Sequence, residues 1–104
     1  MTKDLEKAEY YVEQCDYTCA LVKGEEIFTS ADRGVAPLLK LVNAGKTACG
    51  FAAADRVAGR GAAFLYILLG VGEVYTRVIS EGALELLKNH GIAVYFRQSV
   101  KTVM

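Results

Sequence analysis

The chain has 104 residues and a mass of 11.3 kDa, and its 12 Lys and Arg residues balance its 12 Asp and Glu residues. With 53% hydrophobic residues it is too apolar for a disordered protein, and with zero net charge it lacks the positive field of a non-specific nucleic-acid binder. This length predicts a single domain over residues 1–104, and we expect no binding to a nucleic-acid duplex.

The pattern of apolar and polar residues predicts helices and strands that alternate along most of the chain. In chain order we expect a helix at 5–15, strands at 18–22 and 27–29, a helix at 35–44, a strand at 48–54, a helix at 56–69, a strand at 73–79, a helix at 81–89 and a strand at 92–96. Residues 97–104 show no clear period. Helices of this length between strands predict parallel pairing through crossovers, and the opening hairpin adds one antiparallel neighbour. We therefore expect a three-layer α/β/α sandwich around a mixed sheet of about five strands.

Residues of the capping type stand at several predicted helix ends. Ser30 and Asp32 are candidate caps for the 35–44 helix, Asp55 for the 56–69 helix and Ser80 for the 81–89 helix. His90 follows the last helix, where an imidazole favours the negative end of the helix dipole. A structural role as a helix cap is enough to explain the presence of each of these residues.

The start of the chain predicts neither export nor a membrane anchor. Residues 1–7 are charged and are not followed by the apolar segment of a signal peptide. The longest apolar run, residues 62–71, is about half of the 20 or so residues that a bilayer span needs. The three cysteines (Cys15, Cys19 and Cys49) are an odd number, which argues against a disulfide framework, and we expect them in the core or at junctions. The sequence thus predicts a soluble, cytoplasmic protein without a membrane partner.

Metal and nucleophilic chemistry have little support in the sequence. His90 is the single histidine, there is no C-x-x-C pair, and there is no G-x-S-x-G motif. We therefore expect no metal and no other cofactor.

The segment around Asp55 is the best candidate for a binding site. It follows a predicted strand and opens a predicted helix, the edge of a sheet at which open α/β folds bind ligands. A helix N-terminus there offers free N–H groups to an anion, and Arg56 and Arg60 would add charge-assisted hydrogen bonds. The simpler interpretation is that Asp55 is only a cap and that the arginines are solvated.

Two other loops are expected to open on the same edge and to complete a pocket. One contains Arg33 and Gly34, and the other contains Ser80 and Glu81. Two glycines inside the 56–69 helix, each less favourable there than alanine by about 1 kcal/mol, suggest a close neighbour such as the sheet or a ligand. The expected ligand-binding residues are Arg33, Gly34, Asp55, Arg56, Gly59, Arg60, Ser80 and Glu81.

Four stretches of the chain, residues 32–39, 53–63, 72–75 and 90–92, resemble a known family. It is the domain-of-unknown-function family eighteen-ninety-three, and the likeness covers nearly the whole chain. The run Asp-[Lys/Arg]-Val-x-Gly-[Lys/Arg]-x-Ala-Ala at residues 55–63 is its most specific part. The resemblance implies a cytidine-deaminase-like fold. It also implies that relatives often continue into a segment with Asn-Arg and a Cys-Pro pair. This sequence lacks that segment, so we expect its role to be absent or to have been removed.

A zinc deaminase places H-x-E or C-x-E at the start of one helix and P-C-x-x-C at the start of the next. The corresponding stretches here, residues 33–36 and 54–58, contain no His, Cys or Glu. We therefore expect zinc-dependent deamination to be absent.

Three classes of function are compatible with this sequence. The favoured one is a binding protein for a nucleotide or another small anionic metabolite. A second is an enzyme in which Asp55 or Glu81 is a general base, which for Asp55 requires a pKa raised by burial. The third is a homodimer or other self-associating interaction module with a surface of tyrosines, drawn from Tyr10, Tyr11, Tyr66, Tyr75 and Tyr95.

Overall fold

Helices and strands alternate along residues 1–103, the part of the chain that this computed structural model describes. In chain order they are α1 (Lys3–Gln14), β1 (Cys19–Lys23), β2 (Glu26–Ser30), α2 (Ala36–Asn43), β3 (Ala52–Ala58), α3 (Arg60–Leu69), β4 (Glu73–Ser80), α4 (Glu81–Asn89) and β5 (Ala93–Val100). The strands form one sheet in the order β2-β1-β3-β4-β5. β1 is antiparallel to both β2 and β3, whereas β3, β4 and β5 are mutually parallel. The mixed five-stranded sheet is confirmed, with two antiparallel pairs instead of the one expected.

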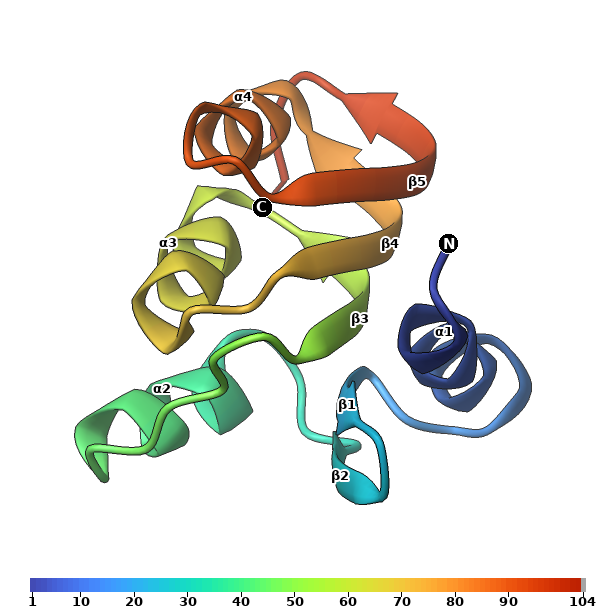
Figure 1. The fold of residues 1–104 in the computed structure, drawn as a ribbon. Coiled ribbons are helices and arrows are strands. Elements are labelled where there is room, and N and C mark those ends of the chain that lie inside the picture. Colours follow the sequence, from blue (N-terminus) through green and yellow to red (C-terminus); the bar gives the residue numbers. More distant parts are fainter. Residues whose placement is uncertain (104) are drawn as a thin grey trace.

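The sheet is covered on both faces, by α1 on one side and by α2, α3 and α4 on the other (Figure 1). Side chains alternate along β1 accordingly. Ala20 and Val22 belong to the apolar cluster beneath α1, whereas Cys19 and Leu21 belong to the larger cluster beneath the other helices. The near-continuous apolar sequence of β1 and β3 follows from this burial on both faces. The three-layer sandwich expected from the sequence is confirmed.

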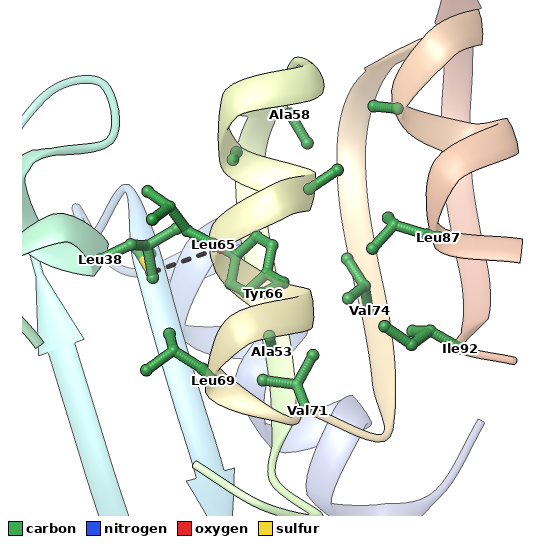
Figure 2. Packing of buried hydrophobic residues seen from close by; sticks show 14 of the residues in the cluster. Leu38, Ala53, Ala58, Leu65, Tyr66, Leu69, Val71, Val74, Leu87 and Ile92 are labelled. Atoms are coloured by element: carbon green, nitrogen blue, oxygen red, sulfur yellow. Dashed lines mark hydrogen bonds between the residues drawn. The ribbon is translucent and has the colours of Figure 1, made fainter. Parts of the chain in front are cut away.

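The larger cluster is centred on α3, whose Tyr66 is fully buried among aliphatic side chains (Figure 2). Small residues let this helix approach the sheet, because Ala62 and Ala63 are buried on its inner side. Gly70 ends the helix in the left-handed conformation with φ +83°, as its sequence predicts. Tyr66 is therefore held in place by packing on all sides.

The boundary between β3 and α3 lies four residues later than the sequence predicts, and this changes the role of Asp55. Asp55 is paired with Thr76 inside the parallel ladder of β3 and β4, so it does not cap a helix. The cap of α3 is Gly59, which makes no side-chain hydrogen bond, and Gly61 lies in the first turn. The prediction failed because pairing with β4 extends the strand beyond the point at which local capping preference would begin a helix.

Two other expectations at element ends are also corrected. α2 begins after Val35 without a side-chain cap, so neither Ser30 nor Asp32 caps it, and Ser30 lies in β2. β5 continues to Val100 through residues that show no period in the sequence, because its ladder with β4 extends that far.

The caps predicted for α4 are confirmed at both ends. The Ser80 hydroxyl accepts a hydrogen bond of 3.1 Å from the backbone N–H of Ala83. At the other end, His90 Nδ1 lies 2.9 Å from the carbonyl oxygen of Leu86.

The cysteines are free, and they differ in environment. Cys19 is buried in β1, Cys15 is half-buried after α1, and Cys49 is exposed in the loop before β3. Within residues 1–103, no helix has the length and apolar character required to cross a membrane.

The packing of α1 gives a stability prediction. Leu5→Ala should lower the free energy of unfolding by about 2–5 kcal/mol, because Leu5 is 0% exposed and its loss leaves a cavity between α1 and the sheet. Tyr10→Ala is the matched control on the same helix, since Tyr10 is 55% exposed and its truncation should cost less than about 1 kcal/mol. Urea denaturation measures both values, and equal losses would contradict the burial of α1.

Candidate functional site

A cavity of about 690 Å³ lies where β3 ends and α3 begins. The loop before α2 forms its other side. Six of the eight expected site residues line it, namely Arg33, Gly34, Asp55, Arg56, Gly59 and Arg60. Ser80 and Glu81 do not line it. The sequence therefore located most of this pocket, although it assigned Asp55 to the wrong element.

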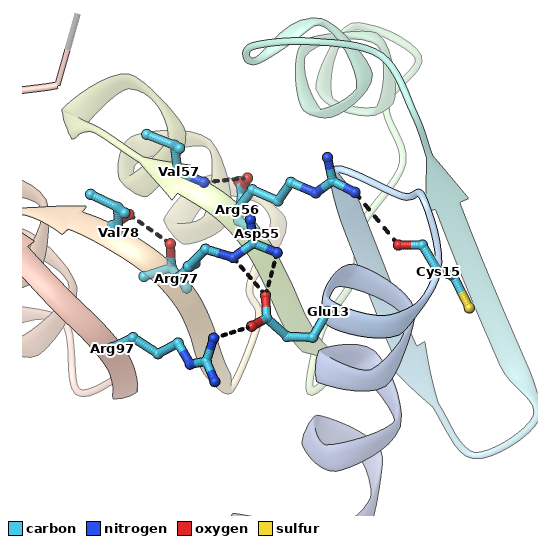
Figure 3. A network of polar contacts seen from close by, with 9 residues as sticks. Glu13, Cys15, Asp55, Arg56, Val57, Arg77, Val78 and Arg97 are labelled. Carbon is cyan, nitrogen blue, oxygen red and sulfur yellow. Dashed lines mark hydrogen bonds and ion pairs between the residues drawn. The ribbon is translucent and has the colours of Figure 1, made fainter.

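Asp55 supplies a buried carboxyl group to the cavity and is 9% exposed. The Tyr66 hydroxyl donates a hydrogen bond of 2.7 Å to Oδ2. The backbone N–H of Val57 donates one of 3.4 Å to Oδ1, which Figure 3 shows. Burial raises the pKa of Asp55 to about 7, even though these hydrogen bonds act to lower it. This is the direction that the general-base hypothesis requires of Asp55.

From Asp55, a series of hydrogen-bonding side chains continues through Tyr66 to Cys19 in the core. Cys19 Sγ lies 3.6 Å from the Tyr66 hydroxyl oxygen, and both groups are buried. Burial raises the pKa of Cys19 to about 12 and raises the pKa of Tyr66 well above its ordinary value, with the Asp55 charge adding to both shifts. The thiol and the phenol therefore stay protonated at neutral pH and act as hydrogen-bonding groups.

Three arginines surround the same cavity, and each is held differently. Arg33 is exposed in the loop before α2. Arg56 is half-buried, with Nη2 3.5 Å from the carbonyl oxygen of Cys15 and with Nε buried and unpartnered within residues 1–103 (Figure 3). Arg60 begins α3. Among residues 1–103, none of the three guanidinium groups forms an ion pair with a carboxylate.

Arg77 of β4 and Arg97 of β5, beneath α1, have a carboxylate partner, unlike the three arginines at the cavity. There, Glu13 of α1 forms ion pairs with Arg77 at 2.8 Å and with Arg97 at 2.9 Å (Figure 3). Glu13 thus pairs with Arg77 and Arg97, whereas the three arginines that line the cavity form no ion pair with a carboxylate of residues 1–103.

The remaining expected site residues lie at the start of α4. Ser80 lines a second cavity of about 240 Å³, together with Arg60 and Val103. Glu81 is exposed and lines neither cavity. The sequence also missed Thr18 and Val103, which line the main cavity. Neither carries a motif, and the fold alone brings these distant segments together.

The residues of the cavity do not fit a zinc ion. Zinc sites in proteins use three or four Cys, His or carboxylate ligands, and Asp55 is the one such residue that lines the cavity within residues 1–103. Cys19 is bonded to Tyr66 and its raised pKa opposes the thiolate form that binds metal. No cluster of three metal-ligating side chains occurs in the described part of the chain.

The architecture belongs to a deaminase-like α/β class. It matches the crystal structure of apo dCMP deaminase from the cyanophage S-TIM5 with a TM-score of 0.57 and 15% identity, over 96% of this chain and 100% of that one. This likeness concerns the fold.

Residues 7–104 match the model of the family described as "Domain of unknown function (DUF1893)", and the chain belongs to this family. A DUF1893 family protein from Thermotoga maritima matches with a TM-score of 0.87 and 25% identity, over 100% of this chain and 71% of that one. Comparison with curated proteins found no match.

The buried carboxyl gives a prediction for the pH dependence of stability. Between about pH 4 and pH 7 native Asp55 keeps a proton that the unfolded chain releases, because the pKa rises from 3.8 to about 7 on folding. The free energy of unfolding should therefore fall as the pH rises, by up to about 1.4 kcal/mol per pH unit from this group.

Urea denaturation of the wild type and of Asp55→Asn across this pH range tests it. The variant lacks the titrating group, so the stability difference between the two proteins should change with that slope. A difference that is independent of pH would contradict the raised pKa of Asp55.

Proposed function

We propose that this protein binds a small anionic metabolite, with nucleotides as the first candidates, in the cavity between β3, α3 and the loop before α2. One observation supports this proposal above all. Arg33, Arg56 and Arg60 line one cavity, and no carboxylate of residues 1–103 forms an ion pair with them. Among the lining residues that the structure describes, Asp55 is the one with a carboxyl group, and its raised pKa reduces its negative charge at neutral pH. A surplus of arginine around a pocket favours carboxylate or phosphate ligands.

The size and lining of the cavity support a ligand larger than a simple ion. About 690 Å³ falls within the roughly 300–1,000 Å³ typical of small-molecule sites. Val35, Val57 and Ala62 provide apolar surface beside the charged groups. The Asp55 carboxyl, buried at the wall, would select a ligand with a hydrogen-bonding group at that point, because a buried polar group disfavours an apolar neighbour.

The fold similarity guides the choice of ligands to test. The phage protein with a similar fold is a dCMP deaminase, so nucleoside monophosphates are sensible first ligands. The chemistry would differ, because Asp55 is the one Cys, His or carboxylate residue among the described residues that line the cavity.

Thermal unfolding in the presence of nucleoside 5′-monophosphates, other small organic phosphates and inorganic phosphate tests this function. A ligand at about 100 times its dissociation constant should raise the free energy of unfolding by about 2.7 kcal/mol. Arg33→Ala and Arg56→Ala should each weaken binding by about tenfold or more, because each removes a charge-assisted hydrogen bond.

Arg97→Ala is the matched control, since Arg97 lies on the opposite face with Glu13. It should leave ligand affinity unchanged. If no anion raises the unfolding temperature, or if the cavity variants bind as well as the wild type, the proposed function is wrong.

A second candidate function, self-association, is favoured by one surface. Four apolar side chains on α2, on α3 and at the residue before α2 are 38–56% exposed, namely Val35, Leu39, Phe64 and Leu68. A helix that is apolar on its outer side, as α3 is, usually has a partner there. The tyrosine surface suggested by the sequence is not formed as expected, because Tyr66 and Tyr75 are buried.

Sedimentation velocity tests self-association. The wild type should show a concentration-dependent increase in mass, and Phe64→Ser should abolish it by placing a polar group on the apolar surface. Tyr10→Ser is the control, because Tyr10 is 55% exposed on α1, on the other side of the sheet. A wild-type protein that stays monomeric at high concentration rules this function out.

A further inference from the structure

Arg60 lines three cavities. It lines the main cavity, the cavity of about 240 Å³ beside the start of α4, and a third of about 310 Å³ that also contains Gly82 and Glu85. Val103 lines the first two of these as well. Since Arg60 and Val103 line both of them, the smaller cavity, of about 240 Å³, is a neighbour of the main one.

The smaller cavity has the chemical groups that bind a phosphoryl group. Its lining contains the cations Arg60 and Lys101 and the hydroxyl-bearing residues Ser80 and Thr102, and none of its lining residues within 1–103 is an Asp or Glu. Ser80 is 4% exposed, and its Oγ already accepts the N–H of Ala83, which leaves its O–H to donate. A phosphoryl group carries up to two charges and three acceptor oxygens, which suits two cations and two hydroxyl donors.

The volume of the smaller cavity limits what it can hold. At about 240 Å³ it is below the roughly 300–1,000 Å³ of sites that take a whole small molecule. It is suited to one end of a ligand whose remaining part lies in the main cavity.

Gly82 determines where the Arg60 side chain can lie. A Cβ atom at this position would be 2.2 Å from Arg60 Nε and 2.9 Å from both Cζ and Nη2. Its φ lies outside the left-handed region, so the backbone conformation does not require glycine. Glycine is unfavourable within a helix, yet here its missing side chain lets the guanidinium lie against the first turn of α4. Gly82 does not itself line the smaller cavity. It lines the neighbouring one with Glu85, so its effect on the smaller cavity acts through the position of Arg60.

We propose that Arg60, Ser80 and Lys101 bind the phosphoryl group of a phosphate monoester whose remaining part occupies the main cavity, and that Gly82 is the positioning residue for Arg60. This inference rests on the proposed function and narrows it from small anions to phosphate monoesters.

Backbone amide NMR titrations test the proposal with three probes: inorganic phosphate, a nucleoside 5′-monophosphate and the corresponding nucleoside. For the wild type we expect saturable shifts at Arg60 and Gly82 with both phosphates. Gly82→Ala and Lys101→Ala should each weaken both phosphates about tenfold and leave the response to the nucleoside unchanged. Gly82→Ala should fold, because alanine favours a helix and the Arg60 side chain can move aside.

Gly72→Ala is the control for Gly82→Ala. Its backbone is also outside the left-handed region, and a Cβ there would meet Gly50 Cα at an ordinary 3.8 Å. It should change none of the affinities.

The outcomes separate this inference from the proposed function. If the monophosphate binds and depends on Arg33 and Arg56 but is unaffected by Gly82→Ala and Lys101→Ala, the phosphoryl site is wrong and the proposed function stands. If the nucleoside binds as tightly as the monophosphate, the phosphoryl site is also wrong. If none of the three probes binds at concentrations up to about 10 mM, both proposals fail for this class of ligand.

Discussion

The hydrogen bond of 2.7 Å from Tyr66 to Asp55 is the interaction on which the candidate site depends. It joins the middle of β3 to the middle of α3, and both residues are buried. A carboxyl group without such a partner would be costly at this depth, because burial strips it of water. Even with Tyr66 as donor, the pKa rises to about 7, so the cost is reduced by retaining a proton. Because packing fixes Tyr66, its hydroxyl stays within hydrogen-bond distance of the Asp55 carboxyl at the wall of the cavity.

Much of the fold could be predicted from local pattern. The alternation of apolar residues and the capping chemistry of Ser80 and Gly70 identified α4, the end of α3 and the sandwich, since these signals act within one or two turns. The error at Asp55 has a different origin. An aspartate after an apolar run is a common cap, and its burial in a strand depends on Thr76 of β4 and on Tyr66 of α3, which no local pattern reveals.

The candidate site, like the fold, could be predicted from the sequence only in part. Arg33, Asp55 and Arg60 were found because loops at one edge of a parallel sheet converge, which is a rule of topology. Lys101 and Val103 were not found, because they reach the site only through the extension of β5 along β4. Gly82 was not found either, since its importance depends on the position of the Arg60 side chain.

The same edge of the sheet can support different chemistry in proteins of similar fold. A deaminase activates water with a zinc ion, and that requires several ligands with available electron pairs. The cavity of this protein instead presents guanidinium groups, which are permanently charged and cannot ligate a metal. Its electrostatics favour an anion over a cation at the position where β3 meets α3. Under the proposed function, the fold would set the position of the ligand at this edge of the sheet, and the arginines that line the cavity would set its negative charge.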